Sequence, residues 1–153
     1  MKTIAFITRV HPKRATMLEA CVDSIKMQSD NDYIHIIHRD DKTENGYGLL
    51  LANQSFAKLG PINARYVMAI DDDDLLIDLN FVKTFRDAVC LDNPEIVFFK
   101  CRVIDKVFPL YPNWRQPPRR GRISGSGFAV RKDVWEKHIH EFGRKSCGDY
   151  SFL

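Results

Sequence analysis

The sequence lacks the features that mark several special classes of protein. No apolar run among its 153 residues reaches the roughly 18 that a membrane-spanning helix needs. The four cysteines form no C-x-x-C pair and no histidine lies at zinc-finger spacing, so buried free thiols explain them better than a zinc site. A net charge of +3 is too small to indicate nucleic acid as a partner. Residues 1–14 mix apolar and charged positions and predict a strand rather than a signal peptide, so we expect a cytoplasmic protein without a transmembrane segment.

The composition that remains is that of an ordinary globular domain. With 44% hydrophobic and 28% charged residues the chain can bury a core, and its length predicts one domain. Apolar, β-rich runs predict buried strands, and apolar residues at helical spacing predict helices between them. The predicted strands cover 3–8, 33–38, 64–70 and 95–104, and the predicted helices cover 12–28, 49–59 and 79–91. This alternation predicts an α/β fold with an open, mostly parallel sheet and flanking helices.

The alternation breaks in the last third of the chain. Residues 107–122 are rich in proline and arginine and predict an extended loop or a hairpin. Four arginines within 115–122 follow Trp114, which fits either a solvated basic loop or a mobile lid over an anionic ligand. A strand at 123–131 and a helix at 132–142 are predicted to follow.

Four consecutive aspartates, Asp71 to Asp74, directly follow the predicted strand at 64–70. Ligands of open α/β sheets bind beyond the carboxyl ends of the strands, and a second acidic pair, Asp40 and Asp41, follows the strand at 33–38. Crowded carboxylates repel one another, so a divalent cation explains the run better than the alternative, a solvated acidic loop. Carboxylate oxygens suit Mg²⁺ or Mn²⁺. Side chains two positions apart in extended chain share a face, so Asp71 and Asp73 can act together while Asp72 points elsewhere.

Five segments resemble, in order, segments of the inverting family 2 glycosyltransferases, which have a GT-A fold. They are "IAFITRVHPKRATMLEACVDSIKMQ", "IHIIHRDDKTEN", "ARYVMAIDDDDLL" with its D-x-D pattern, "ISGSGFAVRKDVWEKH" on the acceptor side, and "GDYSFL" at the start of a catalytic helix. The resemblance covers most of the chain. It implies one GT-A-like domain over 1–153, with a nucleotide-binding half at 1–104 and an acceptor-side half at 105–153 that we expect to be incomplete.

The resemblance also implies an activity. The protein would be a metal-dependent glycosyltransferase that moves a sugar, with inversion, from a nucleotide-diphosphate donor to a hydroxyl acceptor. UDP is the favoured nucleotide, and the acceptor would be a glycan, a lipid-linked glycan or a protein. Mn²⁺ or Mg²⁺ would be the cofactor, held by Asp73 and Asp71. Asp149 would be the general base that takes the acceptor proton.

Further residues would bind the donor. The resemblance assigns this role to Thr8, Arg9, Asp40, Asp41, Asp71 and Asp72. Gly125 and Ser126 lie in the predicted strand at 123–131, where two readings are open: a close approach of the backbone to the donor sugar or the acceptor, and a simple bend or bulge.

Two other functions stay open, and so does the role of Asp149. A sugar-nucleotide nucleotidylyltransferase would use a similar sheet, but it would want a glycine-rich phosphate loop after the first strand, and "TRVHPKR" has no glycine. A non-catalytic or degenerate domain would bind a nucleotide sugar without turning it over. For Asp149 itself, the alternative to a catalytic base is a helix N-cap.

Overall fold

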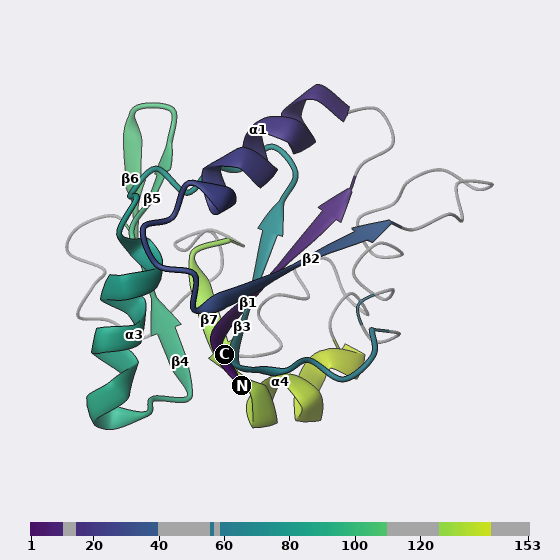
Figure 1. Ribbon diagram of the computed structural model, residues 1–153, viewed down its shortest axis with the longest axis vertical. Coiled ribbons are helices and arrows are strands. Elements are labelled where there is room, and N and C mark those ends of the chain that lie inside the picture. The colour runs from purple at the N-terminus through teal and green to yellow at the C-terminus, as the bar shows by residue number, and fades with distance from the viewer. Residues whose placement is uncertain (11–14, 40–55, 57–58, 110–125, 142–153) are drawn as a thin grey trace.

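The fold is built on a five-stranded sheet with helices on both faces. A computed structural model describes residues 1–10, 15–39, 56, 59–109 and 126–141 (Figure 1). The helices and strands, in chain order, are β1 (Lys2–Val10), α1 (Ala15–Lys26), β2 (Tyr33–Arg39), β3 (Ala64–Asp71), α3 (Phe81–Asp92), β4 (Ile96–Phe98), β5 (Cys101–Val103), β6 (Lys106–Phe108), β7 (Phe128–Arg131), α4 (Lys132–His138) and the 3-10 helix η3 (Ile139–Glu141).

The strand order confirms a mostly parallel sheet. The order is β2-β1-β3-β7-β4, and a separate two-stranded sheet pairs β5 with β6. β1 is parallel to both β2 and β3, whereas β7 is antiparallel to β3 and to β4. β7 is therefore the one reversed strand of an otherwise parallel sheet in the described part of the chain, and the α/β class predicted from the sequence is confirmed.

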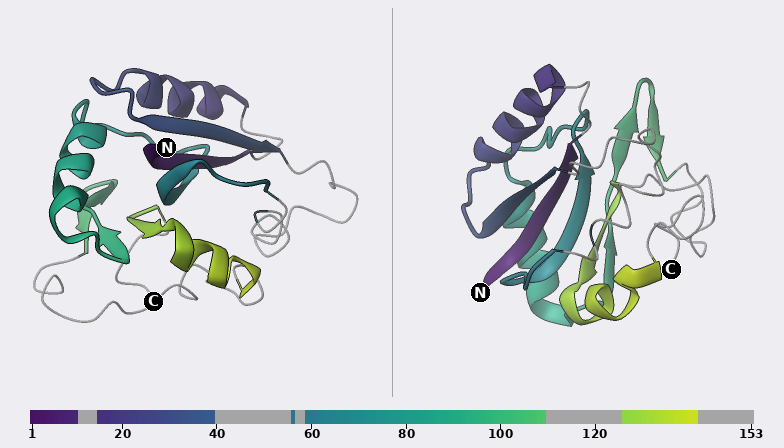
Figure 2. Two further views of the ribbon diagram at one scale, coloured as in Figure 1. Left: turned by 60° about the horizontal axis from the view of Figure 1, so that its bottom comes forward. Right: turned by 90° about the vertical axis from the view of Figure 1, so that its right-hand side faces the viewer.

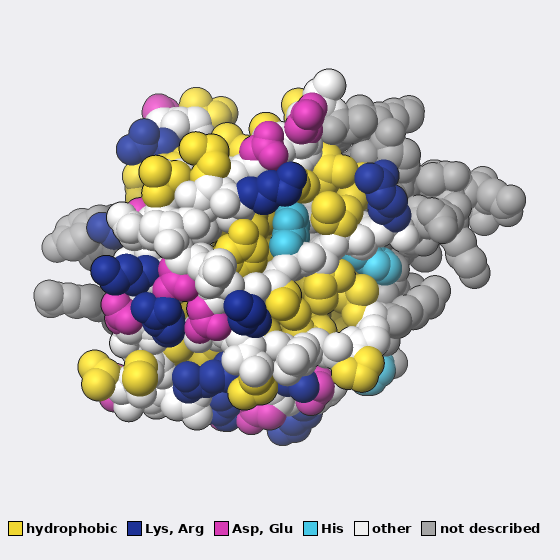
Figure 3. Space-filling model, viewed as in Figure 1, with side chains coloured by type: hydrophobic (Ala, Val, Ile, Leu, Met, Phe, Trp, Pro, Cys, Tyr) yellow, Lys and Arg dark blue, Asp and Glu magenta, His cyan; other side chains and the backbone are white. Residues whose placement is uncertain are grey.

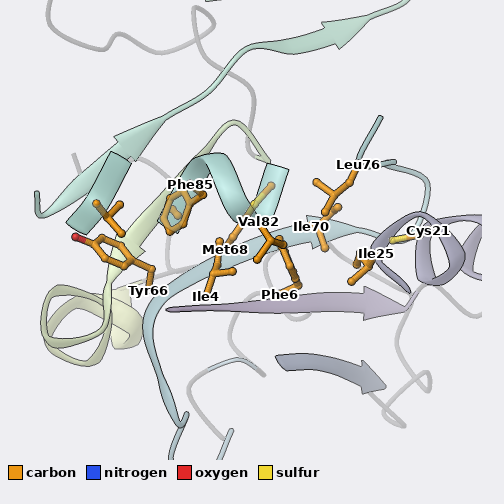
Figure 4. Close-up of a cluster of buried hydrophobic side chains, with 12 residues drawn as sticks. Ile4, Phe6, Cys21, Ile25, Tyr66, Met68, Ile70, Leu76, Val82 and Phe85 are labelled. Carbon is orange, nitrogen blue, oxygen red and sulfur yellow. The ribbon is translucent and has the colours of Figure 1, made fainter. Parts of the chain in front are cut away.

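β1 is the centre of the core because its side chains are buried on both faces. Its even positions Ile4 and Phe6 pack in a cluster with residues of α1 and α3 (Figure 4). Its odd positions Ala5 and Ile7 pack on the opposite face, with residues of α4 and η3. This follows from the two-residue period of a strand, and a strand buried on both faces reads as a continuous apolar run. Figure 2 shows α1 and α4 on opposite sides of the sheet.

The helical patterns predicted from the sequence match the buried faces. Leu18, Cys21 and Ile25 of α1 are buried, as are Val82, Phe85 and Val89 of α3. Each set follows the three-and-four spacing of one helix face. Within the described residues, no helix is long and apolar enough to cross a membrane. Acidic, basic and apolar side chains are interspersed on the face shown in Figure 3.

Two predicted elements differ from the structure. The single strand predicted at 95–104 is wrong: β4 ends at Phe98, and β5 begins a hairpin with β6. β4 bonds to β7 in the five-stranded sheet, whereas β5 pairs with β6 and its Arg102 and Val103 are exposed, so the second part of the run does not continue the five-stranded sheet. The helix predicted at 132–142 is α4 followed by η3. The helix predicted at 49–59 lies almost entirely outside the described residues.

Candidate active site

The C-terminal ends of the parallel strands β1, β2 and β3 lie together on one side of the sheet, which we call its carboxyl edge (Figure 1). In register, Arg9 of β1 lies opposite Asp71 of β3, and Val10 lies opposite Arg39 of β2. The aspartate run therefore leaves the sheet at the carboxyl edge, beside the end of its central strand. This is the edge at which open α/β sheets bind ligands.

The four aspartates occupy four different environments. Asp71 accepts a hydrogen bond from the Arg9 guanidinium at 2.7 Å. Asp72 is buried, with only 1% of its surface exposed, and Asp73 is exposed. Asp74 accepts a hydrogen bond from the Ser126 hydroxyl, and its backbone N–H donates to the Asp71 carbonyl at 3.0 Å, which closes a turn. The run therefore forms a hydrogen-bonded turn, and Asp73 within it is exposed to solvent.

Asp71 has a shifted pKa, and its carboxylate is paired with Arg9. Burial raises the pKa of the Asp71 carboxyl; the Arg9 guanidinium lowers it, and the three neighbouring carboxylates raise it further. The net shift is upward. A raised carboxyl pKa means that the ionised form is disfavoured, here mainly because the carboxyl is buried. The Arg9 guanidinium, 2.7 Å from Asp71 Oδ1, is a positive charge that the structure places beside this carboxylate.

A series of hydrogen-bonded polar side chains lies inside the fold, next to the carboxyl edge. Thr8 is fully buried, and its hydroxyl lies 2.7 Å from His35 Nε2 and 3.8 Å from the Cys21 thiol. The Cys21 thiol donates to the Asp71 carbonyl at 3.6 Å. Burial, with a smaller effect of Lys26, lowers the pKa of His35, so the imidazole is neutral at pH 7. Burial raises the pKa of Cys21 to about 11, so its thiol keeps its proton. These hydrogen-bonded side chains are neutral, and they connect β1, β2, α1 and β3.

The sequence analysis did not identify the polar residues in α1, and just after it, that form hydrogen bonds to the chain following the aspartates. Ser24 Oγ accepts a hydrogen bond from the Leu76 N–H at 3.1 Å. The Gln28 amide donates to the Asp78 carbonyl at 2.9 Å and accepts from the Val82 N–H at 3.1 Å. Cys21, Ser24 and Gln28 lie at i, i+3 and i+7, one helix face. The sequence did contain a signal for them: these polar residues are spaced like the buried apolar residues of a helix face.

The predicted site residues are only partly brought together. The structure joins Arg9 to Asp71 and Ser126 to Asp74, while the Thr8 hydroxyl is engaged inside the fold. Four predicted site residues lie outside the described residues: Asp40, Asp41, Gly125 and Asp149. In the part of the chain that the structure describes, no group of three or more His, Cys, Asp or Glu residues is placed to hold a metal ion.

Comparison with solved structures identifies the fold. A glycosyltransferase involved in the glycosylation of the major capsid of PBCV-1 is 14% identical, with a TM-score of 0.54, and the match covers 88% of this chain. TarS 1-349 of S. aureus is 12% identical, with a TM-score of 0.58 over 97% of this chain. The fold is GT-A-like. No protein-family model and no curated protein matches the sequence.

The GT-A-like chain is shorter than both of these structures. It spans 62% of the PBCV-1 glycosyltransferase chain and 53% of the TarS chain. At 12–14% identity the likeness establishes the fold, and the chemistry has to be argued from the residues of the site.

Proposed function

We propose that this protein is a glycosyltransferase that moves a sugar from a nucleotide-diphosphate donor to a hydroxyl acceptor. The observation that carries the proposal is the position of Asp71 to Asp74, a structured acidic turn at the carboxyl edge of the parallel strands. In a GT-A-like fold, this edge is where a nucleotide would lie. The family resemblance of the sequence favours UDP and inversion.

The residues of the turn fit a divalent cation that completes its coordination with substrate. Mg²⁺ usually binds through one or two carboxylates, with waters and phosphate oxygens supplying the rest, so a cage of three protein ligands is not needed. Asp73, exposed, and Asp71, at the end of β3, would be the protein ligands. Mn²⁺ or Mg²⁺ would offset the negative charge that develops on the diphosphate leaving group.

Other residues of the chain would position the reactants and move the proton. Asp40 and Asp41 would bind the base and ribose of the donor. Asp149 would accept the proton of the acceptor hydroxyl as its oxygen attacks the anomeric carbon, while the bond from that carbon to the diphosphate breaks. One in-line displacement of this kind inverts the anomeric centre.

The first experiment is calorimetric titration of UDP, GDP and CMP, each with and without Mn²⁺. UDP is expected to bind, to require Mn²⁺, and to lose at least roughly tenfold in affinity in Asp73→Asn, because a carboxylate ligand is removed. Asp92→Asn is the matched control, since Asp92 is an exposed aspartate at the end of α3, before β4, and its variant should bind as the parent does.

Two results would count against the proposal in different ways. If no nucleotide binds with or without metal, the acidic turn is not a donor site. If UDP binds but no free sugar is released from UDP-sugars, and no acceptor is glycosylated, the protein is a nucleotide-sugar-binding domain.

A further inference from the structure

The fourth aspartate of the turn, Asp74, is hydrogen-bonded to a residue far from it in the sequence. The Ser126 hydroxyl donates to Asp74 Oδ2 across 52 positions of sequence. The Asp74 backbone is tied as well, because its N–H bonds to the carbonyl of Asp71. Asp74 therefore links the end of β3 to the segment that leads into β7. A hydroxyl that donates to a carboxylate makes a short, charge-assisted hydrogen bond, stronger than one between neutral groups.

Its neighbours have other surroundings. Asp71 is paired with Arg9, Asp72 is buried, and Asp73 is exposed. Because Asp74 closes the turn by its backbone, any movement of Asp74 changes the direction of the two residues between it and Asp71. The link from Ser126 therefore restrains one end of the turn that carries Asp73.

We propose that Ser126 and Asp74 are positioning residues, whose hydrogen bond holds the acidic turn so that Asp71 and Asp73 face one cation. This inference rests on the proposed function. In it, Ser126 acts through Asp74 and does not touch the donor, and Asp74 does not ligate the metal. The hydrogen bond also joins the end of β3 to the segment that leads into β7, so it would couple the donor-side and acceptor-side halves of the proposed site.

The experiment measures Mn²⁺ binding in the presence of UDP, by calorimetry and by the electron paramagnetic resonance signal of free Mn²⁺. Ser126→Ala is expected to weaken Mn²⁺ binding about tenfold, the low end of the effect seen when groups that orient metal ligands are removed. Ser126→Thr keeps the hydroxyl and Asp74→Asn keeps an acceptor oxygen, so both should stay within about threefold of the parent.

The opposite assignment makes opposite predictions. If Asp74 is itself a metal ligand, Ser126→Ala releases its carboxylate, so Mn²⁺ affinity is unchanged or rises. Asp74→Asn then loses Mn²⁺ binding altogether. Either of these results overturns the inference.

A matched serine separates positioning from general destabilisation. Ser29 donates to Asn80 Oδ1 at 2.8 Å, a serine contact at the far end of the same loop. Ser29→Ala should bind Mn²⁺ and UDP as the parent does; a tenfold loss there as well would show that any loosening of the loop suffices and would overturn the inference. If the parent protein binds no UDP with Mn²⁺, the proposed function fails and the inference falls with it. If the parent binds and Ser126→Ala binds equally, the inference alone fails.

Discussion

At the scale of single residues, Ile104 stands out because its backbone conformation conflicts with its side chain. It lies in the turn between β5 and β6 with φ of 56°, and 92% of its surface is exposed. A left-handed conformation costs an ordinary L-residue roughly 1–2 kcal/mol, and a branched β-carbon makes it worse. Asparagine tolerates this conformation well. An exposed isoleucine contributes little burial to offset the cost.

We expect Ile104→Asn to raise the free energy of unfolding by about 1 kcal/mol, because strain is relieved and almost no buried surface is lost. Urea denaturation measures this directly. Val103→Asn is the control: Val103 is exposed in the same hairpin but lies in the strand β5, where asparagine is disfavoured. Its variant should be no more stable than the parent. Equal stability of Ile104→Asn and the parent would show that the turn is not strained.

At the scale of elements, the contact of α1 with the chain after β3 fixes the candidate site to the core. Gln28 is the centre of this contact, since it is 8% exposed and its amide bonds to backbone groups of Asp78 and Val82. Ser29 adds a second link, where its N–H donates to the Leu79 carbonyl at 2.8 Å. The chain that follows the acidic turn is thereby anchored to the segment directly after α1.

Gln28→Ala is expected to destabilise the protein by about 2 kcal/mol, because it leaves the buried Val82 N–H without its Gln28 acceptor. It also removes one donor to the Asp78 carbonyl, which still accepts from the Phe81 N–H. Urea denaturation and hydrogen exchange at the Val82 amide measure the effect. Met27→Ala, at the exposed neighbouring position, should change stability by less than about 0.5 kcal/mol. If both variants lose the same amount, the amide contacts of Gln28 contribute nothing specific.

Local sequence patterns predicted where the helices and strands lie, but they predicted less well which residues contact one another across the fold. Two patterns lie within short stretches of the sequence and can be recognised there: the apolar run of β1, and the helical spacing of Val82, Phe85 and Val89 in α3. The link from Gln28 to Val82 spans 54 positions and depends on how α1 lies against the turn, which no local pattern encodes. The carboxyl-edge position of the aspartates was predictable, because a strand end is a local feature; the pairing of Asp74 with Ser126 was not.

At the scale of the whole molecule, the sheet interleaves the two halves of the chain. β7 lies between β3 and β4, and it bonds to both. β4 therefore has its sheet partner in the last third of the sequence. The contact of Asp74 with Ser126 crosses the same junction. The nucleotide-binding half predicted at 1–104 thus includes a strand whose place in the sheet is supplied by the acceptor-side half at 105–153.

This topology predicts that residues 1–104 do not fold alone. Without β7, the edge of β3 is left open, β4 has no partner, and apolar residues that pack on Phe128 and Val130 become exposed. The isolated 1–104 chain should show no cooperative urea transition, whereas the full chain should. Adding residues 105–153 as a separate chain should restore part of the transition, because the missing strand is returned. A cooperative transition of 1–104 alone would mean that β1, β2 and β3 with α1 and α3 form a sufficient core, and that β7 and α4 are an addition to it.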